Sequence, residues 1–212
     1  ELDASIMRAS DRQAGAVSSV TEIRHPISLA IAVMEASPHV MLTGRGAEEF
    51  AASQGLETVH PSWFFTERRW QSMLRRVDSL SLERPERPHG VPAYEETISE
   101  GELDLLEREH AFGTVGVVVR DMSGETVAGT STGGTTAKRW GRVGDSPIIG
   151  AGTFAAGSCG LSATGTGEYF IRLNVAARIC TLVEIGGLSA QAAADQVIQE
   201  ELTAIGGDGG II

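Results

Sequence analysis

Short apolar runs alternate with amphipathic segments through the first 82 residues. The apolar run at residues 16–20 predicts a buried strand, and Pro26 suits the first turn of a helix that runs to about Ala36. A second apolar run at residues 39–44 predicts another buried strand, and residues 47–54 predict a short helix that Gly55 ends. The pattern therefore predicts strands that alternate with helices.

An amphipathic segment from Pro61 to about Leu82 predicts a longer helix. Its inward positions would be Trp63, Trp70, Met73, Leu74, Val77 and Leu80, and its outward positions Arg68, Arg69, Arg75 and Arg76. Four arginines on one face are compatible with a phosphate site. Because the whole chain is acidic, a solvated helix face is the preferred interpretation.

The pattern changes after residue 82. Residues 83–113 carry three prolines and then many glutamates, which is typical of a linker. Residues 114–121 and 126–132 are β-like on either side of a turn, so a buried hairpin is expected directly after the linker. Residues 168–185 predict one long helix, Ser189 begins another to about Ile205, and the last residues resemble the start of a strand.

Composition narrows the class of protein. The chain of 212 residues is 42% hydrophobic and 21% charged, as expected for one folded domain with a sizeable core. It has 17 Lys and Arg against 28 Asp and Glu, a net charge of −11, so nucleic acid and anionic membranes are not expected partners. No apolar run approaches the roughly 18 residues of a membrane span, and no membrane partner is expected.

Cysteine and histidine residues give little sign of a reactive site. Cys159 and Cys180 could form at most one bridge, and a free, buried Cys159 that behaves as a small apolar residue is favoured over a nucleophile. This usage, and the lack of a signal-peptide pattern, predict a reducing compartment and a cytoplasmic protein. The five histidines show no metal-ligand spacing, so no metal site is predicted.

Threonine and glycine gather in the second half of the chain. Each such segment alone is compatible with ordinary strand ends and turns, whereas together they suggest a ligand site built from backbone amides and hydroxyl groups. The segments are Gly113-Thr114-Val115-Gly116, Thr130-Ser131-Thr132-Gly133-Gly134, Gly141-Arg142-Val143-Gly144-Asp145-Ser146-Pro147 and Thr164-Gly165-Thr166-Gly167-Glu168.

In the order and spacing of these four motifs, the chain resembles the plant-type asparaginase and isoaspartyl-peptidase branch of the N-terminal-nucleophile hydrolases. The resemblance implies an α+β fold, the four-layer αββα sandwich of that class. It also implies a precursor that cuts itself between Gly113 and Thr114. Residues 1–82 would then belong to an α subunit, residues 83–113 to a linker ending at the cleavage site, and residues 114–212 to a β subunit.

The resemblance implies a role for each motif. Thr114 would be the nucleophile, its new terminal amine the base, and Thr132 the residue that orients it. The Thr164 hydroxyl and the Gly165 amide would form an oxyanion hole. Arg142 would bind the substrate α-carboxylate and Asp145 its α-ammonium group, unless these two merely form a local surface ion pair. The remaining expected substrate-binding residues are Val143, Gly144, Thr166 and Gly167.

The implied substrates are small molecules, L-asparagine and β-aspartyl dipeptides, and the intact protein would be a homo-oligomer of cleaved αβ units. The family's first strand, His-Gly-Gly turn, sodium-binding loop and closing strands have no counterpart in this sequence. No cofactor is therefore expected, and the sandwich is expected to be incomplete. Two alternatives remain open, an uncleaved binding remnant and a glycosylasparaginase. Members of the latter group carry Asn in place of Gly134 and Asn-Gly-Asp in place of residues 166–168.

Overall fold

The computed structural model describes residues 1–91 and 113–212, so the acidic part of the predicted linker, residues 92–112, lies outside the described residues. The first half contains β1 (Leu2–Arg8), β2 (Ala14–Val20), α1 (Pro26–Ala36), β3 (Met41–Thr43), α2 (Gly44–Ser53), a 3₁₀ turn (Pro61–Phe64) and α3 (Glu67–Ser79). The second half contains β4 (Thr114–Arg120), β5 (Thr126–Thr132), β6 (Thr153–Ala156), β7 (Cys159–Gly165), α5 (Gly167–Leu173), α6 (Val175–Glu184), α7 (Ala190–Ala194), a π-helical stretch (Asp195–Leu202) and β8 (Gly209–Ile211).

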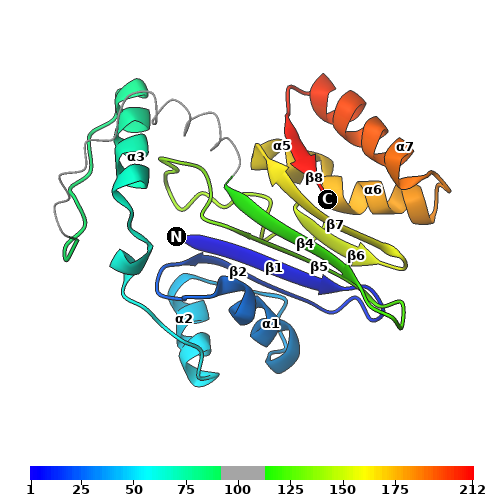
Figure 1. Ribbon diagram of the computed structural model, residues 1–212, viewed down its shortest axis with the longest axis horizontal. Coiled ribbons are helices and arrows are strands. Elements are labelled where there is room, and N and C mark those ends of the chain that lie inside the picture. The colour runs from blue at the N-terminus through cyan, green and yellow to red at the C-terminus, as the bar shows by residue number, and fades with distance from the viewer. Residues whose placement is uncertain (92–112) are drawn as a thin grey trace.

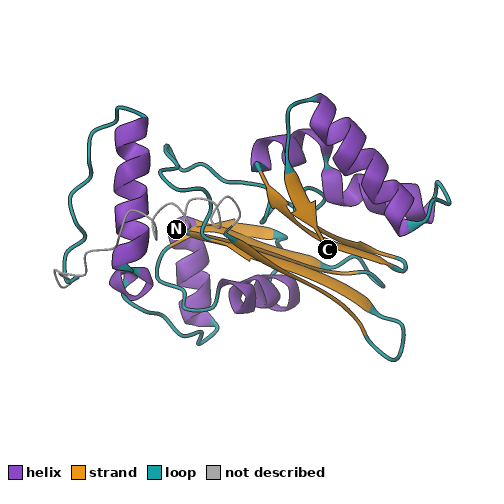
Figure 2. Cartoon of the chain, turned by 45° about the horizontal axis from the view of Figure 1, so that its top comes forward, coloured by secondary structure: helices purple, strands orange, loops and turns teal. Residues whose placement is uncertain are grey.

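The strands form two sheets that face each other (Figures 1 and 2). The larger sheet has the order β3-β2-β1-β5-β4, and the smaller sheet has the order β6-β7-β8. Strands β4 and β5 contact β7, and β1 contacts β6, while α1 packs on β1 and β2 and α6 packs on β6 and β7. The described residues therefore form a mixed α+β structure with the sheets inside and helices on both outer faces.

Strand β1 was not predicted, although it lies at the centre of the larger sheet between β2 and β5. Asp3, Ala4 and Ser5 are all fully buried. Asp3 and Ser5 share the face that looks toward the smaller sheet. Residues 2–6 do alternate between apolar and polar, as in a half-buried strand, but here the polar face is buried as well.

The hairpin expected at residues 114–132 is present as β4 and β5, but only one of its strands is buried. β5 is largely buried, but β4 is an edge strand on which Val115, Val117 and Val119 are 70%, 52% and 51% exposed. These three valines share the face of the sheet on which α1 packs over β1 and β2. The buried strand expected at residues 39–44 is likewise an edge strand, β3, and Val40 and Met41 are 55% and 42% exposed. An apolar run cannot show whether its strand will lie at the edge of a sheet, so the burial of both strands was overestimated.

Two of the predicted helices are interrupted. The helix expected over residues 61–82 is a 3₁₀ turn followed by α3, and Trp63 and Leu80, both predicted inward, are 59% and 42% exposed. The helix expected over residues 168–185 is divided into α5 and α6 at Asn174, whose φ of 54° is left-handed. Asparagine adopts this conformation more readily than most residues, so nothing in the apolar spacing marks the break.

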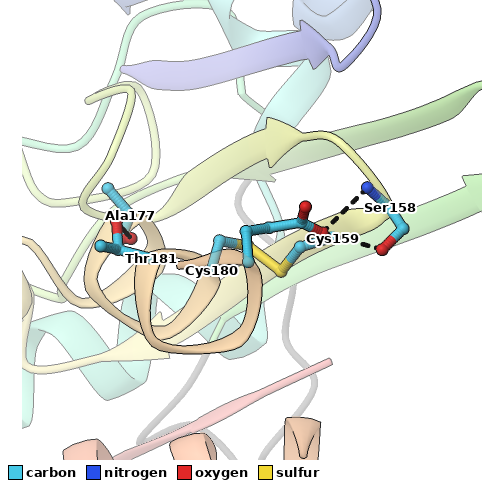
Figure 3. The surroundings of a disulfide bond; sticks show 6 residues. Ser158, Cys159, Ala177, Cys180 and Thr181 are labelled. Carbon is cyan, nitrogen blue, oxygen red and sulfur yellow. Dashed lines mark hydrogen bonds between the residues drawn. A yellow bond between two sulfur atoms is a disulfide. The ribbon is translucent and has the colours of Figure 1, made fainter. Parts of the chain in front are cut away.

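The expectation of free cysteines is wrong. Cys159 on β7 and Cys180 on α6 form a disulfide that joins the smaller sheet to the helix that covers it (Figure 3). The two cysteines therefore no longer favour a reducing compartment, and the cytoplasmic location stays a prediction without their support. Within the described residues, no helix is both long enough and apolar enough to cross a membrane.

Gly15 on β2 allows α1 to lie directly on the larger sheet. A Cβ atom on Gly15 would overlap the carbonyl oxygen of Ala30 and lie 2.6 Å from the backbone nitrogen of Met34. Because only backbone movement could relieve this overlap, we expect Gly15→Ala to lower the free energy of unfolding by about 3 kcal/mol. Gly46→Ala, in α2 with nothing within 4 Å, is the control and should raise it by about 0.5–1 kcal/mol. Urea unfolding that ranks the two variants the other way would contradict this packing.

Candidate active site

Two threonines meet at the ends of neighbouring strands. Thr114 begins β4 and lies opposite Thr132, the last residue of β5, so both side chains point to the face that looks toward the smaller sheet. Thr114 Oγ1 donates a hydrogen bond of 3.1 Å to Thr132 Oγ1. The backbone N–H of Gly134 donates to the same Thr132 oxygen at 3.0 Å. The Thr132 hydroxyl is thus held in place beside that of Thr114.

A small cavity joins these threonines to the other motifs. Its volume is about 20 Å³, and it lies between the end of β5, the end of β7 and the loop before β6. The lining residues are Gly113, Thr114, Thr132, Gly134, Thr135, Arg142, Gly144, Asp145, Ser146, Thr164 and Gly165. All four Thr- and Gly-rich segments of the sequence therefore contribute to one site.

Three residues expected at this site do not line the cavity. Val143 is half-buried in the loop, and Thr166 Oγ1 donates a hydrogen bond of 3.1 Å to the carboxylate of Asp208 instead. Gly167 lies behind the cavity, where a Cβ atom would be 2.8 Å from Asp145 Oδ1 and 2.9 Å from Arg142 Nη2. A side chain at position 167 would push both charged groups out of place.

Arg142 and Asp145 do not pair with each other, so the alternative of a local surface ion pair is wrong. Arg142 binds Glu168 instead, through Nε to Oε1 at 2.8 Å and Nη2 to Oε2 at 2.9 Å. These hydrogen bonds from the guanidinium lower the pKa of the Glu168 carboxyl group. Glu168 belongs to the fourth motif, but no role at the site was predicted for it.

Asp145 is 5% exposed, and its Oδ2 atom has no hydrogen-bond partner within residues 1–91 and 113–212. Burial raises the pKa of this carboxyl group from its usual value of 3.8 to about 6. A buried carboxylate oxygen that lacks a donor is costly, and an incoming cationic N–H group would satisfy it. The site therefore offers a cation at Arg142 and a buried anion at Asp145, in the lining of the cavity that the paired threonines also line.

The raised pKa of Asp145 predicts a pH dependence of stability. Between about pH 4 and pH 6 the folded chain binds a proton at Asp145 that the unfolded chain has released, so stability falls as the pH rises. From pH 4 to pH 7 we expect the unfolding free energy of the wild type to fall by up to about 3 kcal/mol relative to Asp145→Asn. Urea unfolding of both proteins at several pH values measures this difference. Parallel pH curves would show that burial of the Asp145 charge is not costly.

Buried hydroxyl groups connect the two sheets beside the cavity. Ser5 Oγ lies 2.6 Å from the carbonyl oxygen of Ser146 and 2.7 Å from Thr153 Oγ1. Thr153 Oγ1 lies 2.5 Å from Thr130 Oγ1, which lies 2.7 Å from Ser162 Oγ. Sequence reasoning missed this network, although the polar residues at alternate positions of β1 were a signal for it.

Lys138 is a second feature that sequence reasoning missed. Its ammonium group lies 3.4 Å from Glu1 Oε2 and 3.6 Å from Asp3 Oδ2, and its side chain is 11% exposed. A Cβ atom on Gly134 would be 3.0 Å from Lys138 Nζ, so Lys138 fills the space that a side chain at position 134 would need.

Among the described residues, no group of three His, Cys, Asp or Glu residues could hold a metal ion.

The comparisons with known proteins show the family of the chain. The family model described as Asparaginase matches residues 1–212, so the chain belongs to that family. It is similar to the isoaspartyl peptidase of Salmonella typhimurium (45% identical over 215 residues, 100% of this chain and 63% of the relative). It is also similar to the isoaspartyl peptidase of Escherichia coli (43%, 100% and 62%) and to the plant-type L-asparaginase of Pyrococcus abyssi (41%, 94% and 61%). The chain thus spans less than two thirds of the length of these relatives.

Proposed function

We propose that this chain is part of a threonine-type amidohydrolase that cuts itself between Gly113 and Thr114 and then hydrolyses L-asparagine and β-aspartyl dipeptides. The observation that carries the proposal is the hydrogen bond of 3.1 Å between the Thr114 and Thr132 hydroxyl groups. Thr114 directly follows the peptide bond that would be cut, so the cut would leave this hydroxyl on a terminal residue. Membership of the Asparaginase family supports it, as do relatives named isoaspartyl peptidase and L-asparaginase.

The cut has a chemical purpose. A threonine hydroxyl is a weak nucleophile at neutral pH and needs a nearby base. A terminal amine, with an ordinary pKa of about 7.7–8.0, serves as a base at neutral pH far better than a lysine amine with a pKa of about 10.4. Scission at Gly113 creates such an amine on Thr114 itself, one covalent bond from the carbon that carries its side chain.

The size of the cavity fits a site that precedes cleavage. About 20 Å³ is room for a water molecule but not for an amino acid, and Gly113 forms part of the lining. Departure of Gly113 and the residues before it would remove that part of the lining and open the cavity to a substrate. On this proposal, residues 1–82 belong to the α subunit, residues 83–113 form the linker, and residues 114–212 belong to the β subunit.

The charges of Arg142 and Asp145 then select a substrate with both a carboxylate and an ammonium group. Arg142 binds the α-carboxylate, and Asp145 accepts hydrogen bonds from the α-ammonium group, which leaves the side-chain amide toward Thr114. The terminal amine takes the Oγ proton as Oγ attacks the amide carbon, and that proton leaves with ammonia or with the departing amino acid. Water then hydrolyses the acyl-enzyme ester and releases L-aspartate.

The oxyanion of the attack is assigned to the Thr164 hydroxyl and the Gly165 amide at the end of β7. Gly165 is held between the ring of Phe170 and the backbone oxygen of Asp208, where a Cβ atom would lie 2.5 Å from that oxygen.

The facing sheets with outer helices support the αββα sandwich of the N-terminal-nucleophile hydrolases as the fold of the whole protein. We propose that the whole protein assembles as a homo-oligomer of cleaved αβ units.

The test is an assay of β-aspartyl-leucine and L-asparagine hydrolysis by this chain and by the full-length protein. Release of aspartate by the full-length protein supports the proposal. If the chain binds L-aspartate but neither protein hydrolyses either substrate, the site is a binding remnant. Release of aspartate only from glycosylated asparagine would identify a glycosylasparaginase instead.

A further inference from the structure

We infer that Glu168 is a positioning residue, which stays on one edge of the Arg142 guanidinium while the substrate carboxylate binds the other edge. This inference rests on the proposed function, because that function gives Arg142 its ligand. Glu168 would not touch the substrate but would act through Arg142.

The hydrogen bonds show which edge is already occupied. Glu168 takes the Nε hydrogen and one Nη2 hydrogen of Arg142, at 2.8 Å and 2.9 Å. A guanidinium carries five N–H donors in one plane, so two remain on Nη1 and one on Nη2. Together these form a second edge, which matches a carboxylate with two parallel hydrogen bonds. Since Arg142 lines the cavity, two carboxylates can share one guanidinium without competing for a donor.

Two glycines keep the guanidinium in this orientation. A Cβ atom on Gly144 would be 2.7 Å from Nη1, and one on Gly167 would be 2.9 Å from Nη2. Only residues without a side chain allow the plane of Arg142 to lie this close to both segments. Gly167 also begins α5, which puts Glu168 in the first turn of that helix, directly beside Arg142.

The two possible roles of Glu168 predict opposite effects on binding. If Glu168 only competes with the substrate for Arg142, its loss should strengthen the binding of a carboxylate ligand. If it positions Arg142, its loss should weaken that binding, since the ligand must then order a long side chain. The Glu168 side chain is 56% exposed, so solvent and salt screen its repulsion of a second carboxylate, whereas the ordering of Arg142, 19% exposed, is not screened.

The experiment is a calorimetric titration of L-aspartate into the cleaved full-length protein, as the wild type, Glu168→Gln and Glu168→Ala. We expect the dissociation constant to rise about threefold in Glu168→Gln, which keeps one acceptor for Arg142, and about tenfold in Glu168→Ala. In assays of hydrolysis, KM should rise with little change in kcat, because the interaction serves binding rather than the transition state alone.

Glu201→Gln is the matched control. Glu201 binds Arg178 through the same Nε and Nη2 edge, with Nη2 2.7 Å from Oε1, and neither residue lines the cavity. The dissociation constant of L-aspartate from Glu201→Gln should equal that from the wild type. Unchanged or tighter L-aspartate binding by both Glu168 variants would overturn the inference and leave the proposed function standing. A wild type that binds no L-aspartate would overturn the carboxylate clamp, and the role of Glu168 with it.

Discussion

Thr114→Ala is expected to leave the chain uncut at Gly113 and to lower the hydrolysis of L-asparagine by at least about 10³-fold. In the proposed mechanism, alanine removes the hydroxyl that attacks the carbonyl of Gly113 and, later, the carbonyl of the substrate. Loss of a nucleophile in comparable hydrolases has effects of this size or larger, because the remaining groups stabilise an attack that no longer occurs. Electrophoresis and an assay of aspartate release measure the two effects on one preparation of the full-length protein.

Thr114→Ser is the matched variant, since serine keeps the hydroxyl group and loses only a methyl group. It should still be cut and should keep measurable activity. Val115→Ala is a control for the strand, because Val115 is 70% exposed and its side chain lies on the opposite face of β4. Cleavage and normal turnover by Thr114→Ala would remove Thr114 from the mechanism.

Arg142→Met is expected to raise KM for L-asparagine by about 100-fold or more, with a smaller change in kcat. Methionine keeps much of the apolar stem but offers no hydrogen-bond donor, so the α-carboxylate loses two charge-assisted bonds. Arg142→Lys should restore binding only in part, since an ammonium group is a single point charge and cannot form both planar hydrogen bonds. Steady-state kinetics of the full-length variants measure these changes.

Arg178→Met is the control for Arg142→Met, because Arg178 forms a similar bidentate pair with a glutamate on the surface but does not line the cavity. It should leave KM unchanged. If Arg142→Met and Arg178→Met behave alike, Arg142 does not bind the substrate carboxylate.

Local sequence patterns predicted the elements whose ends carry strong signals. The helix from Pro26 to about Ala36 is confirmed as α1, with proline in its first turn. The helix that Ser189 begins is confirmed as α7 and the π-helical stretch, and Ser189 Oγ accepts the hydrogen bond from the N–H of Ala192 at 3.2 Å. These features depend on neighbouring residues, so a single sequence contains them.

Features that depend on distant residues could not be predicted in the same way. The disulfide joins residues separated by 21 positions, and no local pattern brings Cys159 to Cys180. On the polar inner face of β1, Ser5 forms hydrogen bonds with residues more than 140 positions away, Ser146 and Thr153.

For the site, the motifs contain most of the residues that line the cavity. They lack Thr135, and Val143, Thr166 and Gly167 were expected there but do not line it. The pairing of Arg142 with Glu168 depends on the fold.

Measurement of the intact mass of the purified wild-type chain after prolonged incubation shows whether Thr114 becomes a chain terminus. We expect two fragments that meet between Gly113 and Thr114, with a free amine on Thr114, and aspartate release that increases with the cut fraction. Full turnover of asparagine by a preparation in which the Gly113–Thr114 bond remains intact would contradict this expectation.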